Sequence, residues 1–160
     1  MSEHSANALQ TILPNAAAIF TETPVPCNCG YIFHRDGTGI FRLASPYRIL
    51  GRTFRGCCCN RRMLQAIYYV TFHGNIAIST GGTVEPITIA LAIDGVVDPS
   101  SIMEISPTVV EEFDNVGAEI SVGVPAICGC ESVSVVNTST QSIDLKNANL
   151  IIRPGSITTV

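Results

Sequence analysis

Seven cysteines are the residues of this 160-residue chain whose spacing most directly suggests chemistry. They fall in three tight groups, a C-x-C pair, a C-C-C run and a second C-x-C pair: Cys27, Cys29, Cys57, Cys58, Cys59, Cys128 and Cys130. Adjacent cysteines rarely bond each other, because a disulfide needs a separation and orientation that neighbours on a strand do not give. Partners would therefore come from different groups, so three loops are expected to converge. The odd number leaves at least one thiol that can pair with another chain.

Besides structural disulfides, two alternatives stay open. The thiols could be free and unreactive, or they could bind a metal ion. Structural zinc sites prefer a C-x2–4-C spacing with a second pair placed likewise. The C-x-C and C-C-C groups fit that spacing poorly, although a threefold axis could gather ligands from three chains. We therefore assign no metal and no cofactor to the chain.

The remaining titratable residues lack the context of a catalytic site. His34 and His73 stand in no H-x-x-H, H-E-x-x-H or H-x-E motif, so both are expected to be structural. Glu111, Glu112 and Asp114 lack the alternating acidic pattern of a calcium loop and predict a solvated turn. No motif supports a Cys/His nucleophile, and the sequence has no phosphate-binding loop and no G-x-S-x-G. The chain is not expected to be an enzyme.

The charge content argues against a nucleic-acid partner. The formal net charge is −4 and only 14% of the residues are charged, against 46% hydrophobic. A surface this poor in charge is either buried against other subunits or rich in Ser, Thr and Asn. One locally basic segment stands out, for which we expect a solvated loop or an ion-pair partner of the acidic cluster: Arg42, Arg48, Arg52, Arg55, Arg61 and Arg62.

Neither membrane insertion nor a signal peptide is expected. No run approaches the roughly 18 to 20 apolar residues of a membrane span. No Lys or Arg precedes Arg35, so the beginning of the chain lacks the positive region of a secretory signal.

Residues 65–95 hold the most regular strand patterns, two long runs joined by a glycine-rich turn. Residues 87–93 alternate large aliphatic with small or polar side chains, as a strand with one buried face does. Residues 67–72 are apolar or aromatic on both faces, which indicates cover on both sides by a second sheet or another copy of the chain. Tyr68, Val70 and Phe72 are accordingly predicted to line a subunit interface.

The rest of the chain predicts further strands and no helix. Residues 1–14 are polar or small and predict a tail that attaches the protein to a partner, and residues 15–160 predict one domain with an irregular Cys- and Arg-rich excursion at 44–62. Strand patterns recur at 16–20, 101–106, 118–124, 132–135 and 149–153, with a hairpin at 31–41. Eight to ten strands without helices indicate an all-β antiparallel sandwich or closed β structure.

Four segments resemble bacterial and phage members of the tumour-necrosis-factor/C1q-like jelly-roll group: GIFRL at 39–43, YYVTFHGNI at 68–76, IALAIDG at 89–95 and the stretch 137–152 with NTST and NANLII. That group includes domains of collagen-like spore-surface proteins and of phage structural proteins. The resemblance covers about residues 16–153. It implies a jelly roll of about ten strands that forms a tight homotrimer, with one sheet packed around the threefold axis. The chain lacks the collagen stalk of such proteins.

These observations predict a non-enzymatic structural protein, a homotrimeric subunit on an extracellular particle such as a virion or a spore surface. Its partners would be copies of itself and, through residues 1–14, other proteins of the particle. One alternative is a self-polymerising filament or shell subunit linked by disulfides. The other is a carbohydrate- or receptor-binding module that recognises a cell-surface glycan through the polar loops 79–83 and 137–141.

Overall fold

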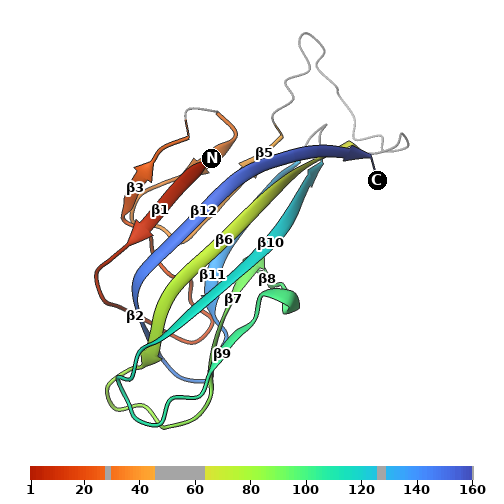
Figure 1. The fold of residues 1–160 in the computed structure, drawn as a ribbon. Coiled ribbons are helices and arrows are strands. Elements are labelled where there is room, and N and C mark those ends of the chain that lie inside the picture. Colours follow the sequence, from red (N-terminus) through yellow and green to blue (C-terminus); the bar gives the residue numbers. More distant parts are fainter. Residues whose placement is uncertain (28–29, 46–63, 126–128, 160) are drawn as a thin grey trace.

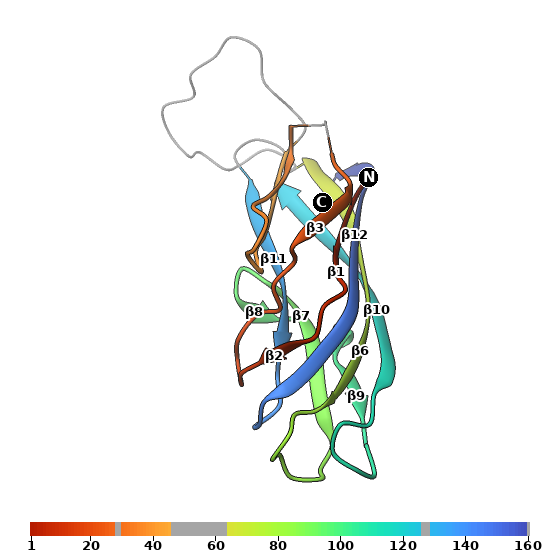
Figure 2. The ribbon, with the colours of Figure 1, turned by 90° about the vertical axis from the view of Figure 1, so that its left-hand side faces the viewer.

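The protein is a sandwich of two six-stranded antiparallel sheets, whose two layers are seen edge-on in Figure 2. The computed structural model describes residues 1–27, 30–45, 64–125 and 129–159. Within them lie twelve strands, labelled in Figure 1, and a short 3-10 turn, η1 (Pro99–Ser101): β1 (Ser2–Ala6), β2 (Gln10–Ile12), β3 (Glu22–Val25), β4 (Ile32–His34), β5 (Phe41–Ala44), β6 (Leu64–Ile78), β7 (Ile87–Ile93), β8 (Val96–Val97), β9 (Met103–Ile105), β10 (Asp114–Pro125), β11 (Cys130–Asn137) and β12 (Ile143–Thr159).

The two sheets have a simple order. Sheet A runs β10-β6-β12-β1-β3, with β2 also pairing β12, and sheet B runs β4-β5-β11-β7-β8, with β9 also pairing β7. All strand pairs in both sheets are antiparallel. The prediction of an all-β antiparallel jelly roll is thus confirmed, with twelve strands in place of the expected eight to ten. In the described part of the chain no helix is long and apolar enough to cross a membrane.

The core lies between the sheets and is built from the inward residues of the long strands. Along β6 the even-numbered residues are buried and the odd-numbered ones are partly or largely exposed from Gln65 to Asn75. Aliphatic residues of β7, β11 and β12 complete this core, among them Ile89, Val135 and Leu150. A period of two explains the pattern, because successive side chains of a strand point to opposite faces.

The predicted subunit interface at Tyr68, Val70 and Phe72 is wrong. All three side chains are buried within a single chain, at 1% exposure or less. The hydroxyl of Tyr68 donates a hydrogen bond of 2.6 Å to the carbonyl oxygen of Ala44, and burial, with a smaller effect of Tyr31, raises the pKa of this phenol to about 12. Sheet B covers these residues, so no second copy of the chain is needed to bury them.

The two regular runs of residues 65–95 are not neighbours in one sheet. β6 belongs to sheet A and β7 to sheet B, so the glycine-rich connection crosses from one layer to the other. The tight turn of this region follows β7, where Asp94 and Gly95 have φ values of 49° and 79° and β8 folds back on β7. Two consecutive positive φ values are the geometry that favours an Asp-Gly pair in a two-residue hairpin.

Residues 1–14 are part of the sandwich, which contradicts the predicted tail. β1 pairs with β12 on one side and β3 on the other, and β2 pairs with β12. Their side chains contribute to the buried set, including His4, Ala6 and Ile12. The pairing partner lies at the far end of the chain, and this non-local pairing orders a segment whose own sequence is only weakly apolar.

Most of the other predicted strands are present in the structure, and one predicted strand is not. β9, β10, β11 and β12 fall where strand patterns were found, and β4 pairs with β5 as a hairpin. Residues 16–20 form no strand and make isolated bridges only, from Ala17 to Val136 and from Phe20 to Thr38. The Cys- and Arg-rich excursion at 44–62 begins at the end of β5, and from residue 46 on it lies outside the described residues.

Candidate interaction face

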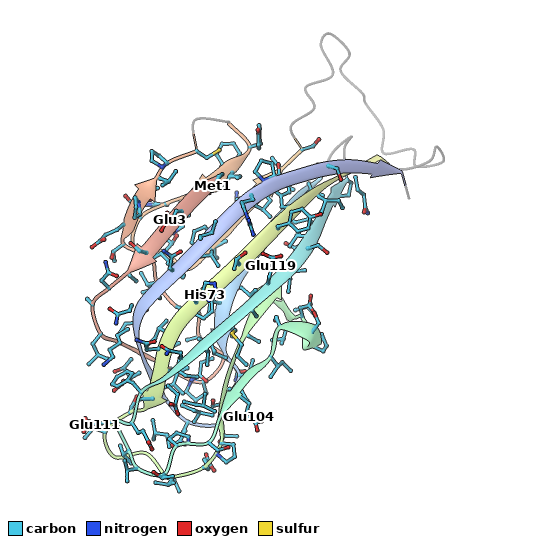
Figure 3. All side chains as sticks on the ribbon, viewed as in Figure 1. Met1, Glu3, His73, Glu104, Glu111 and Glu119 are labelled. Atoms are coloured by element: carbon cyan, nitrogen blue, oxygen red, sulfur yellow. The ribbon has the colours of Figure 1, made fainter. Side chains whose placement is uncertain are left out.

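The outward surface of sheet A faces the viewer in Figure 3. We call it the outer face of sheet A. Strand alternation and register place on it residues from four adjacent strands: Glu3 of β1; Asn149, Ile151 and Arg153 of β12; Ile67, Tyr69, Thr71 and His73 of β6; and Gly117, Glu119, Ser121 and Gly123 of β10. Figure 3 shows Glu3, His73 and Glu119 spread over this face.

Tyr69 is the large aromatic residue of the outer face and is 40% exposed. Its cross-strand neighbours are Ser121 on β10 and Arg153 on β12. Gly155 lies against the ring, since a Cβ atom at this glycine would come within 2.6 Å of Tyr69 Cε2. With the small residues Ser121 and Gly155 among its neighbours, the tyrosine ring stays accessible on the sheet surface.

Two charges of the outer face, Glu119 and Arg153, are paired with each other. Oε2 of Glu119 accepts hydrogen bonds from the Thr71 hydroxyl at 2.6 Å and from Nη2 of Arg153 at 2.7 Å. The Thr71 hydrogen bond, followed by the charge and hydrogen bond of Arg153, holds the pKa of Glu119 below its usual value. On the β1 side, Nδ2 of Asn149 donates to Oε1 of Glu3 at 2.6 Å. A second surface brought against Glu119 and Arg153 would meet no net charge.

The cysteines can be followed at two positions. Cys27, just after β3, is disulfide-bonded. Cys130, at the start of β11, is a free and exposed thiol. The predictions for Cys29, Cys57, Cys58, Cys59 and Cys128 lie outside the described residues. The expected convergence of the three cysteine groups stays a prediction.

The histidines divide into one exposed and two buried residues. His73 lies exposed on the outer face of sheet A. His34, at the end of β4, has a side chain only 1% exposed, and it contacts His4 of β1 across the sandwich. His4 is not among the candidate residues predicted from the sequence, because residues 1–14 were expected to form a tail. The one local signal was the alternation Ser2, His4, Ala6, which predicts a strand face only once a pairing partner is known.

In the acidic cluster, the carboxylates of Glu111 and Glu112 lie in the turn before β10 and accept hydrogen bonds from other residues of the chain. Oε2 of Glu112 accepts hydrogen bonds from the backbone N and the hydroxyl of Thr108, at 2.7 and 2.9 Å, and these bonds lower its pKa. Oε1 of Glu111 accepts from the Thr80 hydroxyl at 2.6 Å. Among the described residues no group of three or more His, Cys, Asp or Glu side chains is placed to hold a metal ion.

A carboxyl pair that the sequence did not reveal joins two strands of sheet B. Asp94, in the turn after β7, accepts from the backbone N of Ser132 at 2.7 Å and shares a hydrogen bond with Glu131 of β11. That shared bond raises the pKa of Glu131 to about 6 and lowers the pKa of Asp94.

Two stacked antiparallel sheets with this strand order define the chain as a jelly-roll sandwich. Among solved structures it is similar to the globular domain of zebrafish complement 1qA protein, with 10% identity, 94% of each chain covered and a TM-score of 0.51. It also aligns with a family 35 carbohydrate-binding module from an environmental isolate (11% identity, 100% and 98% covered, TM-score 0.40) and with CBM35 from Cellvibrio japonicus Abf62 (10%, 93% and 99%, 0.38).

These similarities show the fold of the chain and do not show its function. At 10% identity the likeness to the complement 1qA domain shows the fold alone, which is the jelly roll predicted from the sequence. No family model matches the chain. No curated protein matches it either.

Proposed function

We propose that this chain is a non-enzymatic structural subunit that self-associates as a homotrimer through the outer face of sheet A. The observation that carries the proposal is Tyr69, exposed at 40% on a regular sheet surface between small neighbours and beside an internally paired Glu119 and Arg153. The resemblance to the tumour-necrosis-factor/C1q-like group supports the trimeric state. The interface now rests on the outward residues of β6, because the inward ones form the core of the single chain.

Association of the subunits would be driven by the apolar surface that it buries. Tyr69 is an aromatic anchor of the kind enriched at interface centres, and the partly exposed Ile67 and Ile151 lie on the same face. Burying a fully exposed apolar side chain contributes about 1.5–3 kcal/mol, and each of these partly buried side chains would contribute a fraction of that. Because Glu119 and Arg153 are already paired with each other, burying both at an interface costs less free energy than burying either charge without a partner.

Replacing Tyr69 with glutamate is expected to break the trimer. In a homo-oligomer the change occurs once in every subunit, so each trimer would bury three added carboxylates, each opposite an Arg153 that is already paired with Glu119. Sedimentation at about 10 µM should show the native protein at three times the 17.0 kDa chain mass and the Tyr69→Glu variant at the mass of one chain.

The matched control is Phe33→Glu, because Phe33 is an aromatic residue 50% exposed on β4 of the other sheet. This variant should remain a trimer. A native protein that sediments as a stable monomer at micromolar concentration would refute the trimer, and a Tyr69→Glu variant that stays trimeric would refute the outer face of sheet A as its interface.

The subunit is further proposed to be displayed on, or to build, an extracellular particle, either a phage virion or a spore surface. The support is the sequence resemblance together with a charged fraction of only 14%. Because residues 1–14 are folded into sheet A, attachment through a free tail is no longer part of the proposal. Neighbouring capsid and tail genes would establish the virion, and sporulation genes the spore. A neighbourhood with neither set of genes would count against both.

A carbohydrate-binding module is the second candidate, and one observation favours it. The two polar loops singled out in the sequence lie side by side, because the Gln141 side chain bonds the backbone N and O of Thr83 at 2.9 and 2.8 Å. This arrangement would present the hydroxyl of Thr83 beside two carboxylates, Glu111 and Glu85, that the hydroxyls of Thr80 and Thr140 hold at one end of the sandwich. Binding to a glycan array, lost on changing these loops, is the expected result. An array without hits would remove this candidate.

A further inference from the structure

Two buried histidines meet across the sandwich where its two sheets share an edge. His4 belongs to β1 of sheet A and His34 to β4 of sheet B, and their ring centroids are 4.7 Å apart. His4 is 4% exposed and the side chain of His34 is 1% exposed. Phe41 of β5 contacts both rings, at 4.8 Å from His4 and 4.2 Å from His34. The imidazoles therefore form part of the packing between the sheets.

The hydrogen bonds assign one proton to each ring. Nε2 of His34 lies 3.1 Å from the carbonyl oxygen of Thr38, which can only accept, so Nε2 carries the hydrogen. The Thr23 hydroxyl donates to Oδ1 of Asp36 at 3.1 Å and lies 3.2 Å from Nδ1 of His4. Since that hydroxyl has one proton and has given it to Asp36, Nδ1 of His4 is the donor to Thr23. In the closed arrangement Nδ1 of His4 and Nε2 of His34 are thus the ring nitrogens whose hydrogens are used in hydrogen bonds.

One nitrogen on each ring is left buried without a partner. These atoms are Nε2 of His4 and Nδ1 of His34. A proton added to Nε2 of His4 would find no acceptor, and the resulting charge would lie in the core beside a second imidazole. Burying a charge without a partner is costly, so the group either stays neutral or leaves the core.

The charged surroundings of His4 come from few groups. β4 contributes His34, and the turn after β4 contributes Asp36, whose Oδ1 is 3.6 Å from Nδ1 of His34. β3 contributes the uncharged Thr23, and β12 places Leu150 opposite His4 in the register. Burial and then His34 lower the pKa of His4 to about 4, and the opposing effect of Asp36 is the smallest of the three. Asp36 therefore does not compensate the charge.

We propose that His4 and His34 form an acid-sensitive latch, in which protonation of His4 releases strands β1 and β3 from the edge of the sandwich while the remaining strands stay folded. The two strands that would be released are short, since β3, at the edge of sheet A, has four residues and its neighbour β1 has five. Short edge strands are the elements that open locally at the lowest free energy. This inference does not depend on the proposed function.

The sign of the pH effect follows from linkage. In the opened state His4 has its ordinary pKa of 6.5, and in the closed state its pKa is about 4. Between these values the opened state binds more protons, so falling pH favours opening, by up to about tenfold per pH unit and about 300-fold in all. Above about pH 7 and below about pH 4 the histidine adds no further dependence.

Amide hydrogen exchange on the whole native protein tests the latch. Exchange rates corrected for intrinsic pH dependence should show protection of β1 and β3 falling at least about tenfold between about pH 7 and pH 5, with β6 and β10 unchanged. The variant His4→Phe keeps an aromatic ring but cannot be protonated, so its β1 protection should not respond to pH. The control Phe33→Leu changes an exposed side chain beside His34 on β4, outside the outer face of sheet A, and should keep the native response.

Three results would overturn the latch: native β1 protection that is independent of pH, an equal loss of protection in β6, or an acid response in His4→Phe as large as in the native protein. If His4→Phe does not fold, imidazole nuclear magnetic resonance of the native protein decides. A His4 that becomes protonated at its ordinary value while β1 stays protected would refute the proposal.

Discussion

Replacing Phe72 with alanine is expected to lower the free energy of unfolding of the single chain by about 3–5 kcal/mol. Phe72 is fully buried on the inward side of β6, opposite Leu150 of β12, and its ring packs over Gly74. The loss combines the transfer free energy of the removed ring with the cost of the cavity that remains between the sheets. Denaturant unfolding, followed at several protein concentrations, measures it.

Tyr69→Ala is the matched control, because Tyr69 is an aromatic residue of the same strand that points outward. In a trimer its loss should weaken association, and the apparent stability of that variant would then depend on protein concentration. The Phe72→Ala loss should be about the same at every concentration. A Phe72→Ala variant that unfolds like the native chain yet fails to associate would restore the sequence-based interface and contradict the structure.

The contrast between Phe72 and Tyr69 shows what strand patterns reveal. A period of two identified the strand and separated its residues into two faces. It did not say which face meets the core, because Ile67, Tyr69 and Phe72 are all apolar or aromatic. That decision depends on the register with β10 and β12 and on sheet B above them, and these contacts come from residues far away in the sequence.

The N-terminal segment shows a second limit, which concerns strands made by their partners. β1 consists of Ser, Glu, His, Ser and Ala and has no strand-forming residue of its own. It is ordered by backbone pairing with β12, about 145 residues later. The His4–His34 contact, and with it the candidate latch, is invisible until that pairing is known. Conversely, the hairpin β4–β5 was predictable, because its turn and both strands are local.

Asn137 is the site of the other large expected effect, although its sequence context suggested only a polar turn. This residue ends β11 and is fully buried. Its Nδ2 atom donates to the carbonyl oxygens of Ile12 and Gln141, both at 2.9 Å, and its Oδ1 atom accepts from the backbone N of Ser139 at 2.8 Å. One amide side chain therefore joins the short strand β2 to β11 and to the loop before β12.

Asn137→Ala is expected to cost about 3–4 kcal/mol of unfolding free energy, because it leaves two carbonyl groups and one backbone N–H without their partner, and a buried unsatisfied group costs about 1–3 kcal/mol. The matched control Asn115→Ala removes an exposed asparagine of β10 and should change stability by no more than about 0.5 kcal/mol. Denaturant unfolding compares the two. Because β2 has only three residues, its amides should also exchange faster in Asn137→Ala before the whole chain unfolds. Equal stability of the two variants would mean that water replaces the amide at no cost, and that β2 is held by its pairing with β12 alone.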